Sequence, residues 1–321
     1  MNSFGRIFRI TLYGSSHGEE LGIVIDGCPV GIPIAENDFT EDINRRRPKG
    51  AENTARCEED KILIRSGVYK GFTDGTPLLL SFKNKDYRDA DYNFDGFFRP
   101  GTADFTAHKK YKAFNNPNGG GMFSGRMTLP LVAAAVVAKK ILPNLLFRIY
   151  DCIFDVQNVT KERYTNLDEA IEMATKLKTS VGGGFSIEVK NIPIGIGEPY
   201  FDSVESVISH AIFSIPGARS ISFANFTDKM PSIINGNGLL NNPLIGVNGG
   251  ITNGNILKFD VCFSPPASIS AEQESYNFKT QKIEKFTIQG RHDICYITRT
   301  PVIVEAMTAI ALADLYLIAS I

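Results

Sequence analysis

The sequence predicts an α+β fold made of two halves of similar design. The order strand, helix, strand occurs once in the first half of the 321 residues and again in the second half, which suits a pseudo-duplicated domain. Hydrophobic residues form 43% of the chain and charged residues 21%, which is typical of a globular protein with ample material for a core. This length suffices for one large domain or two ordinary ones.

The net charge and the cysteines exclude several classes of protein. A net charge of −1 argues against a general polyanion binder, so we expect no nucleic-acid partner. The sequence has no Cys-X-X-Cys pair and no Cys/His spacing typical of a metal site. The cysteines are odd in number and widely scattered, at Cys28, Cys57, Cys152, Cys262 and Cys295. We therefore expect reduced thiols, a cytoplasmic location and no bound metal.

One apolar stretch, residues 302–321, approaches the length of a membrane span. It contains Glu305 and Asp314, and carboxylates are costly inside a bilayer, so it predicts a buried helix and no membrane partner. Near the N-terminus, Arg6 and Arg9 interrupt the apolar run early, so we expect no signal peptide.

The first element is a strand, a tight turn and a return strand. Residues 7–13 and 21–25 are rich in β-branched and aromatic side chains, and glycines flank the short polar segment Ser15-Ser16-His17 between them. His17 lies at the tip of this hairpin. An imidazole titrates near neutral pH and suits proton transfer, but a solvated histidine that decorates the turn is an equally good interpretation.

Residues 35–47 predict a short helix that ends in Arg45-Arg46-Arg47 and is stopped by Pro48. The three arginines fit either a solvated helix face or an anion clamp, because guanidinium groups match carboxylate and phosphate oxygens. Strand-like runs follow at 62–64 and 77–82, and then a polar loop at 84–96.

The cluster Gly119-Gly120-Gly121 precedes a predicted helix over residues 129–142. A glycine loop before a helix N-terminus can hold phosphate on backbone N–H groups, but it can also be a flexible connection. The cluster lacks the Gly-Lys-Ser/Thr of a Walker loop. No strand directly precedes it, which argues against a dinucleotide fingerprint and an NAD-type dehydrogenase.

The second half alternates in the same manner. We expect strands at 145–156, 185–189, 220–224 and 257–263, and helices at 166–178, 202–213 and from 302 onward. Three glycines at 182–184 precede the strand expected at 185–189, and a glycine-rich turn is expected at 246–254.

Six separated blocks, in this order, resemble the chorismate synthase family over effectively the whole chain. They are Gly14-Ser15-Ser16-His17-Gly18; Arg45-Arg46-Arg47-Pro48; Arg99-Pro100-Gly101-Thr102-Ala103-Asp104; Gly119-Gly120-Gly121 through Arg126; Gly249-Gly250-Ile251-Thr252-Asn253-Gly254; and Gly290-Arg291-His292-Asp293. The resemblance implies a single domain over residues 1–321, with helices packed between two antiparallel sheets in a β-α-β sandwich.

The resemblance also implies an activity. Members of the family are phosphate lyases of the shikimate pathway of aromatic amino acid biosynthesis, usually homotetramers. With reduced FMN they convert 5-enolpyruvylshikimate 3-phosphate to chorismate and phosphate, without net redox change. We expect FMN reduced by an external flavin reductase, with NADPH involved only indirectly, because no reductase segment is added to the chain.

The family pattern implies a role for individual residues. His17 would protonate the leaving phosphate, and Asp293 would assist removal of the ring hydrogen near the flavin, although the residues alone favour a capping role for Asp293. The substrate carries a phosphate and two carboxylates, which arginines hold well; the candidates are Arg46, Arg47, Arg99, Arg126 and Arg291. The expected cofactor contacts are Met122, Phe123, Ser124, Pro216, Gly217, Gly249, Ser264, Pro265, Pro266, Ala267, Ser268 and Arg291.

Several positions depart from the family pattern. Thr102 replaces a second catalytic histidine, for which His108 is the nearby imidazole along the chain. The other departures are Met122 for arginine, Phe123 for serine, Met127 for glutamate, Ser264 for lysine and Pro243 for histidine. Each lost charge-assisted contact costs about 1.5–3 kcal/mol. A divergent chorismate synthase is therefore the first hypothesis, and a non-catalytic or repurposed relative that binds another anion is the alternative.

Overall fold

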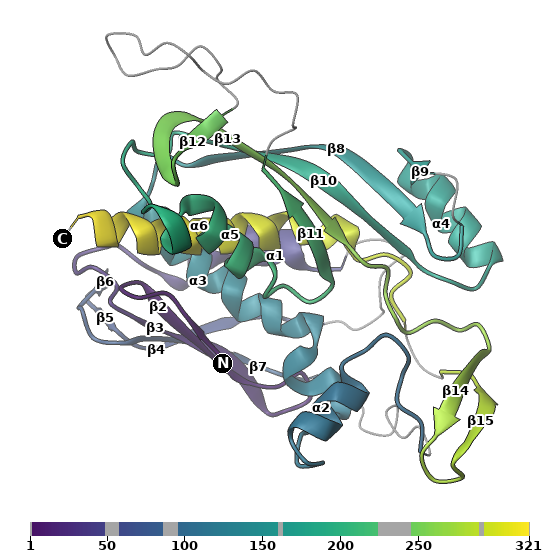
Figure 1. Ribbon diagram of the computed structural model, residues 1–321. Coiled ribbons are helices and arrows are strands. Elements are labelled where there is room, and N and C mark those ends of the chain that lie inside the picture. Colours follow the sequence, from purple (N-terminus) through teal and green to yellow (C-terminus); the bar gives the residue numbers. More distant parts are fainter. Residues whose placement is uncertain are drawn as a thin grey trace.

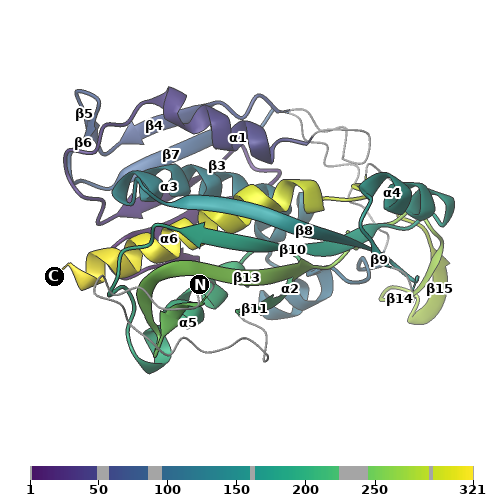
Figure 2. The same cartoon turned by 90° about the horizontal axis from the view of Figure 1, so that it is seen from above.

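Two antiparallel sheets enclose a layer of helices (Figure 1). The computed structural model describes residues 2–48, 58–85, 96–159, 163–223, 245–288 and 292–320. This arrangement confirms the predicted α+β class and the β-α-β sandwich. Viewed from above, the long C-terminal helix (yellow) runs nearly parallel to the long strands of the second sheet (Figure 2).

The first sheet comes from the N-terminal part of the chain. Its strand pairing confirms the predicted opening hairpin, because Gly14 pairs with Leu21 at the end that carries the His17 turn. Its spatial order is β1 (Ser3–Phe4), β2 (Arg9–Gly14), β3 (Glu20–Asp26), β7 (Leu78–Lys83) and β4 (Ile62–Ser66). A small hairpin, β5 (Val68–Tyr69) and β6 (Phe72–Thr73), adjoins it.

The second sheet comes from the C-terminal half. Its order is β11 (Ala218–Ser222), β13 (Ile251–Phe263), β10 (Val181–Lys190), β8 (Leu146–Val156) and β9 (Arg163–Tyr164), and β12 (Ile245–Asn248) also pairs with β13. The strand predicted at 185–189 is confirmed and is longer than predicted, because the glycines at 182–184 also lie inside the central strand β10. A Cβ atom at Gly183 would overlap the carbonyl oxygen of Ile153 on β8, so close strand packing explains the glycine here.

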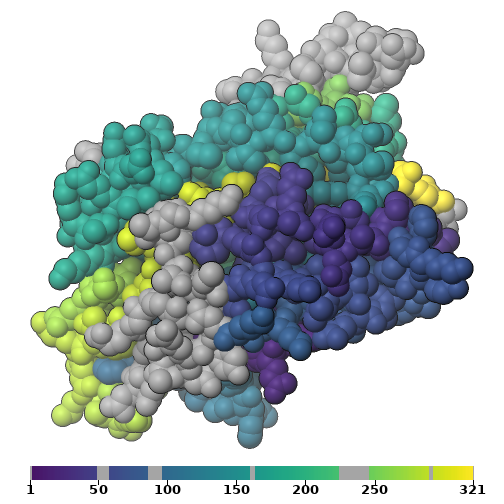
Figure 3. Space-filling view, turned by 180° about the vertical axis from the view of Figure 1, so that it is seen from behind, coloured from purple at the N-terminus to yellow at the C-terminus, as the bar shows by residue number. Residues whose placement is uncertain are grey.

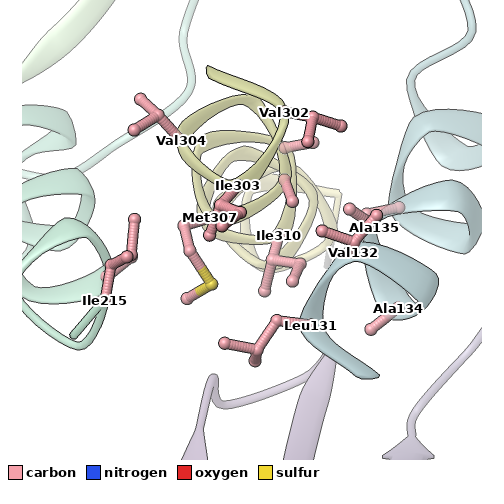
Figure 4. Close-up of a cluster of buried hydrophobic side chains, with 14 of the residues drawn as sticks. Leu131, Val132, Ala134, Ala135, Ile215, Val302, Ile303, Val304, Met307 and Ile310 are labelled. Atoms are coloured by element: carbon pink, nitrogen blue, oxygen red, sulfur yellow. The ribbon is translucent and has the colours of Figure 1, made fainter. Parts of the chain in front are cut away.

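The long helices α3 (Thr128–Ile141) and α6 (Thr300–Ala319) form the centre of the sandwich. Val132 and Ala135 of α3 point toward α6 beside Ile310, within a cluster of buried apolar side chains (Figure 4). Helices that are apolar all round are typical of a core covered on both faces. α6 is long and apolar enough to cross a membrane, but 78% of its apolar window is buried inside the protein. It is thus the predicted buried helix.

Three further helices cover the edges of this layer and the second sheet. They are α1 (Thr40–Arg46) after the 3-10 turn η1 (Glu36–Phe39), α4 (Leu167–Lys176), and α5 (Val204–Ile212) after η5 (Tyr200–Asp202). All three agree with predicted helices. Seen from behind, the N-terminal half and the second sheet stack, with parts of α6 visible between them (Figure 3).

Two carboxylates on α6 are buried because each has fixed partners. Asp314 accepts hydrogen bonds from the backbone N–H groups of Arg6, Ile7 and Phe8 at 2.7–2.9 Å. Glu305 forms a two-bond ion pair with Arg45 at 2.6 and 2.7 Å. Buried charges require such compensation, so both acids fasten the helix to the N-terminal part of the chain.

One end of the sandwich, opposite the C-terminus, carries α2 (Asp104–Lys110) and the hairpin of β14 (Gln273–Asn277) and β15 (Lys282–Phe286) (Figure 1). The two are joined by aromatic contacts of Phe98 with Phe278 (4.8 Å between ring centroids) and with Phe105 (5.8 Å). Neither element was among the predicted ones.

Candidate functional site

A cavity of about 940 Å³ opens between the helical layer, the opening hairpin and the loops at this end of the sandwich. Its walls come from segments distant in sequence: residues 16–17, 46–48, 58–60, 99–107, 115–128, 213–218, 264–268, 288 and 292–303. Among the described residues, five arginines and four carboxylates line it. The cavity is therefore a charged site assembled by the fold.

His17 enters the cavity from the tip of the β2–β3 hairpin. Its Nδ1 lies 3.2 Å from Oγ of the buried Ser16. The hairpin tip is held from below by Asn84, whose Nδ2 donates to the carbonyl oxygens of Ser15 (3.1 Å) and Gly18 (2.7 Å). The imidazole is thus a fixed part of the cavity wall. This favours a functional histidine over a solvated histidine that only decorates the turn.

The glycine cluster packs against His17. A Cβ atom at Gly119 would overlap Nδ1 of the imidazole, and Gly119, Gly120 and Gly121 all have positive φ. They belong to the 3-10 turn η3 (Asn118–Phe123), and Gly121 accepts a hydrogen bond from the backbone N–H of Ser16 at 3.3 Å. The glycines therefore give the backbone room to approach the histidine ring.

Four of the predicted substrate arginines, Arg46, Arg47, Arg99 and Arg126, line the cavity. Arg46 is buried and donates from Nε to Oγ1 of Thr128 (2.9 Å) at the start of α3. The side chains of Arg45–Arg47 therefore lie in two environments. Arg45 pairs with Glu305, whereas Arg46 and Arg47 line the cavity.

Arg126 is buried in a polar cluster of its own. It donates from Nε to Asn84 (2.8 Å) and from Nη1 to Asp60 (2.9 Å), and its Nη2 lies 3.9 Å from Glu58. It lies in the turn η4 (Gly125–Met127), which leads into α3. Neutralisation by these acids leaves a smaller share of its charge for an anionic ligand.

Arg99 is held by a two-bond ion pair with Asp104, at 2.7 and 2.8 Å. Thr102, between them, donates to the carbonyl oxygen of Arg99 (2.9 Å) and accepts from the backbone N–H of Asp104 (3.2 Å). The hydroxyl of Thr102 therefore caps the first turn of α2.

His108 does not replace the missing imidazole. It lies on α2 beside Phe98, 5.0 Å between ring centroids, and lines a separate small pocket with Phe97 and Phe278. Of the described histidines, His17 and His292 line the main cavity, and His210 packs against Phe4.

The predicted cofactor residues form one wall of the cavity, which is largely apolar and small in side chain. It consists of Met122, Phe123, Ser124, Pro216, Gly217, Ser264, Pro265, Pro266, Ala267 and Ser268. Tyr296 covers part of it: its hydroxyl donates to the carbonyl oxygen of Ser264, and a Cβ atom at Gly217 would overlap that hydroxyl. Burial raises the pKa of Tyr296. A largely apolar wall of small side chains, with a close backbone approach at Gly217, suits an aromatic ring system such as isoalloxazine.

Asp293 also lines the cavity, on the segment before α6. Arg299 donates from Nη2 to Oδ2 of Asp293 at 2.7 Å, and His292 lies 3.1 Å through Nε2 from the carbonyl oxygen of Ile288. All four residues line the cavity. Asp293 therefore has a defined charged partner in addition to a place at the site.

Two predicted contacts have another outcome. Gly249 is not among the residues that line the cavity: it lies in the turn between β12 and β13, where its φ of +61° suits a glycine, and its cofactor contact stays a prediction. Arg291 and Pro243 lie outside the described residues.

Several lining residues were not predicted, notably Tyr296, Arg299, Asp60 and Glu58. Arg299 and Tyr296 follow the Gly290–Asp293 block by a few residues, which was the available signal. In the described ranges, no group of three His, Cys, Asp or Glu side chains comes together as a metal site.

Comparison with known proteins gives one family. The family model described as chorismate synthase matches residues 8–317. A chorismate synthase of Chitinophaga pinensis is 44% identical, over 99% of this chain and 97% of the relative. A chorismate synthase of Dehalococcoides mccartyi is 35% identical, over 98% and 96%. A crystal structure of a chorismate synthase covers 98% of this chain and 92% of its own with a TM-score of 0.72, at 21% identity, which supports the fold.

Proposed function

The chain belongs to the chorismate synthase family, and we propose that its main cavity carries out that family's reaction, the elimination of phosphate from 5-enolpyruvylshikimate 3-phosphate to give chorismate. The protein is accordingly a phosphate lyase. The observation that carries the assignment of the site is the convergence of His17, Asp293 and four arginines from distant segments on one cavity. Relatives at 44% and 35% identity carry the enzyme's name, and nothing favours the non-catalytic alternative.

The arginines supply the binding of a substrate with one phosphate and two carboxylates. Arg46 and Arg47 lie at the end of α1, Arg99 on the segment before α2, and Arg126 in the turn before α3. Asp104 and Asp60 hold Arg99 and Arg126 in position before a ligand arrives. Such preorganisation lowers the cost of ordering long side chains when the substrate binds. Arg291 remains a proposed member of this set.

His17 acts on the leaving group. When the C–O bond breaks, its electron pair departs with the phosphate, and a proton from an imidazolium neutralises the developing charge. Ser16 and Gly119 hold the ring, so the imidazole needs little reorganisation at the moment of reaction.

Asp293 acts on the ring hydrogen. The C–H bond breaks, its electron pair becomes part of the new diene, and the proton goes to a carboxylate oxygen. One C–H and one C–O bond are thus exchanged for one carbon–carbon double bond, a proton and phosphate. The overall change is redox-neutral.

The family uses reduced FMN, and the apolar wall is where we expect this chain to hold it. Met122, Phe123 and Ser124 from η3, the Pro216–Gly217 turn and residues 264–268 would contact the flavin. When bound, reduced FMN supplies electron density transiently to the substrate. We expect an external reductase to deliver it, with NADPH used only there.

A homotetramer and a cytoplasmic location are proposed together. Phe114, Tyr200 and Phe201 are 86–92% exposed, and exposed aromatic side chains are enriched at contact surfaces. The described cysteines, Cys28 among them, are all free thiols, in keeping with a reducing compartment. Light scattering of the purified protein measures the oligomeric state directly.

An anaerobic assay tests the function. Protein, chemically reduced FMN and 5-enolpyruvylshikimate 3-phosphate should yield phosphate catalytically, and a flavin titration should give micromolar binding. Loss of product with Asp293→Asn and His17→Ala, at unchanged flavin binding, assigns the reaction to this cavity. Absence of product from wild-type protein that binds both flavin and substrate would contradict the proposal.

A further inference from the structure

The ion pair between Arg299 and Asp293 lies at the wall of the cavity. Nη2 of Arg299 is 2.7 Å from Oδ2 of Asp293, and the side chains are 16% and 24% exposed. Both residues line the cavity, as do Thr300 and Ile303 in the first turn of α6. The pair is therefore largely sheltered from solvent and adjoins the space where a ligand would bind.

The backbone on both sides of the pair is anchored in the core. Cys295, two residues after Asp293, is fully buried and bridges to Val181 of β10, whose N–H donates to the carbonyl oxygen of Ile294 at 2.8 Å. Arg299 ends the 3-10 turn η6 (Ile297–Arg299) and donates its N–H to the carbonyl oxygen of Tyr296 at 3.0 Å. The six-residue separation between the partners is thus fixed by β10 and α6.

This pair differs from the Arg99–Asp104 pair, which also lines the cavity. Arg99 occupies both oxygens of Asp104 through Nε and Nη2, and Asp104 also accepts from the N–H of Arg99. Arg299 engages Asp293 through Nη2 alone, and its Nε is buried without a hydrogen-bond partner among the described residues. Arg99 thus contacts both oxygens of Asp104, whereas Arg299 contacts one oxygen of Asp293.

We propose that Arg299 is a positioning residue that sets the orientation of the Asp293 carboxylate for removal of the ring proton. This inference rests on the proposed function of Asp293. A carboxylate that turns freely about its terminal torsion samples many directions, and misplacement by 1 Å of a reacting group costs about 100-fold in rate. Held at Oδ2 by a charged partner, the carboxylate keeps one orientation. The step is a proton transfer from the ring carbon to that carboxylate, and the C–H electron pair enters the new double bond.

The test is a double-mutant cycle on the purified protein with reduced FMN. Arg299→Ala should lower kcat by about 10- to 100-fold and change KM less than threefold, because the substrate is held by other arginines. Adding Arg299→Ala to Asp293→Asn should cause no further loss, because two residues that act as a unit are not additive. Arg299→Lys, which restores a single charged donor, should recover most of the activity.

A deuterium label at the ring carbon that loses hydrogen gives a second readout. Arg299→Ala should raise the isotope effect on kcat, because proton removal becomes more strongly rate-limiting. A purely structural role for Arg299 does not change this value. Arg163→Ala is the matched control, since its partner Asp155 lies on the solvent-exposed edge formed by β8 and β9, 3.6 Å away.

The outcomes separate this inference from the proposed function. Wild-type protein without activity overturns both. Active wild-type protein with normal kcat for Arg299→Ala, a loss confined to KM, or losses that multiply in the double variant overturn the role of Arg299 alone. If Arg299→Ala does not fold, Arg299→Gln keeps a polar side chain but removes the positive charge that pairs with Asp293, and a loss of kcat with an unchanged KM is expected.

Discussion

Gly119 lies directly against the imidazole of His17: a Cβ atom on the glycine would overlap Nδ1 of the ring. The two residues are 102 positions apart and belong to the η3 turn and the β2–β3 hairpin. Their contact gives the glycine cluster a specific task, to admit and fix the ring that faces the cavity.

Gly119→Ala should therefore impair catalysis more than stability. The added methyl group displaces the imidazole, so we expect kcat to fall about 100-fold. The φ of +59° adds a backbone cost of about 1 kcal/mol. Gly71→Ala is the matched control, because Gly71 also has positive φ but open space around its Cα. Steady-state phosphate release and urea unfolding of both variants provide the comparison; equal kcat in the two would remove the task assigned to Gly119.

Thr102→Ala should destabilise the protein by about 1 kcal/mol, the usual cost of removing a helix cap. The hydroxyl accepts from the N–H of Asp104 and donates to the carbonyl oxygen of Arg99. Thr102→Ser keeps both bonds and should restore most of the lost stability. Urea unfolding curves measure the difference, and an Ala variant as stable as the Ser variant would show that the cap contributes nothing.

Met122→Arg should strengthen binding of FMN more than binding of riboflavin. A new cation on the proposed cofactor wall can form a charge-assisted hydrogen bond with the phosphate of FMN, worth about 1.5–3 kcal/mol, or roughly 10- to 100-fold in affinity. Riboflavin lacks the phosphate and serves as the matched ligand. Fluorescence titration with both flavins checks this, and an equal gain for the two would place the phosphate away from residue 122.

The raised pKa of Tyr13 predicts that the stability of the protein depends on pH in the alkaline range. Burial, and then the hydrogen bond with Glu20 (2.9 Å), raise the pKa of Tyr13 to about 12. In the unfolded chain the phenol ionises near pH 10. Its contribution to stability is complete below pH 10 and is lost as the pH rises from about 10 to 12, because only the unfolded state then releases the proton.

The difference in unfolding free energy between wild type and Tyr13→Phe isolates this contribution. Between about pH 10 and 12, the wild type should lose about 1 kcal/mol of unfolding free energy relative to Tyr13→Phe, after allowance for screening by solvent. Denaturant unfolding at several pH values up to 11.5 measures it. Parallel pH profiles for the two proteins would contradict the assigned cause.

Periodicity predicted the elements that have one clear buried face. The opening hairpin, α3, α4 and β8 follow their expected ranges within a few residues. The start of β10 was missed because glycine usually breaks a strand, whereas close packing of Gly183 against β8 requires it here. The β14–β15 hairpin is mostly polar and half exposed, so it has no strong pattern to detect.

The site was accessible from the sequence only as separate blocks in a familiar order. That order pointed to His17, Asp293 and the arginines, which line one cavity. Partners such as Asp60 for Arg126, 66 positions apart, depend on the three-dimensional fold and leave no local spacing. Gly249 matches a motif but is not among the residues that line the cavity, so its cofactor contact stays a prediction.

The central claim, that this cavity eliminates phosphate by means of His17, is tested most directly by an anaerobic single-turnover experiment. Wild-type protein in excess over substrate, with reduced FMN, should form chorismate and phosphate in equal amounts, and His17→Ala should form both at least 100-fold more slowly while still binding substrate. Equal rates for the two proteins, or phosphate without chorismate, would contradict the account.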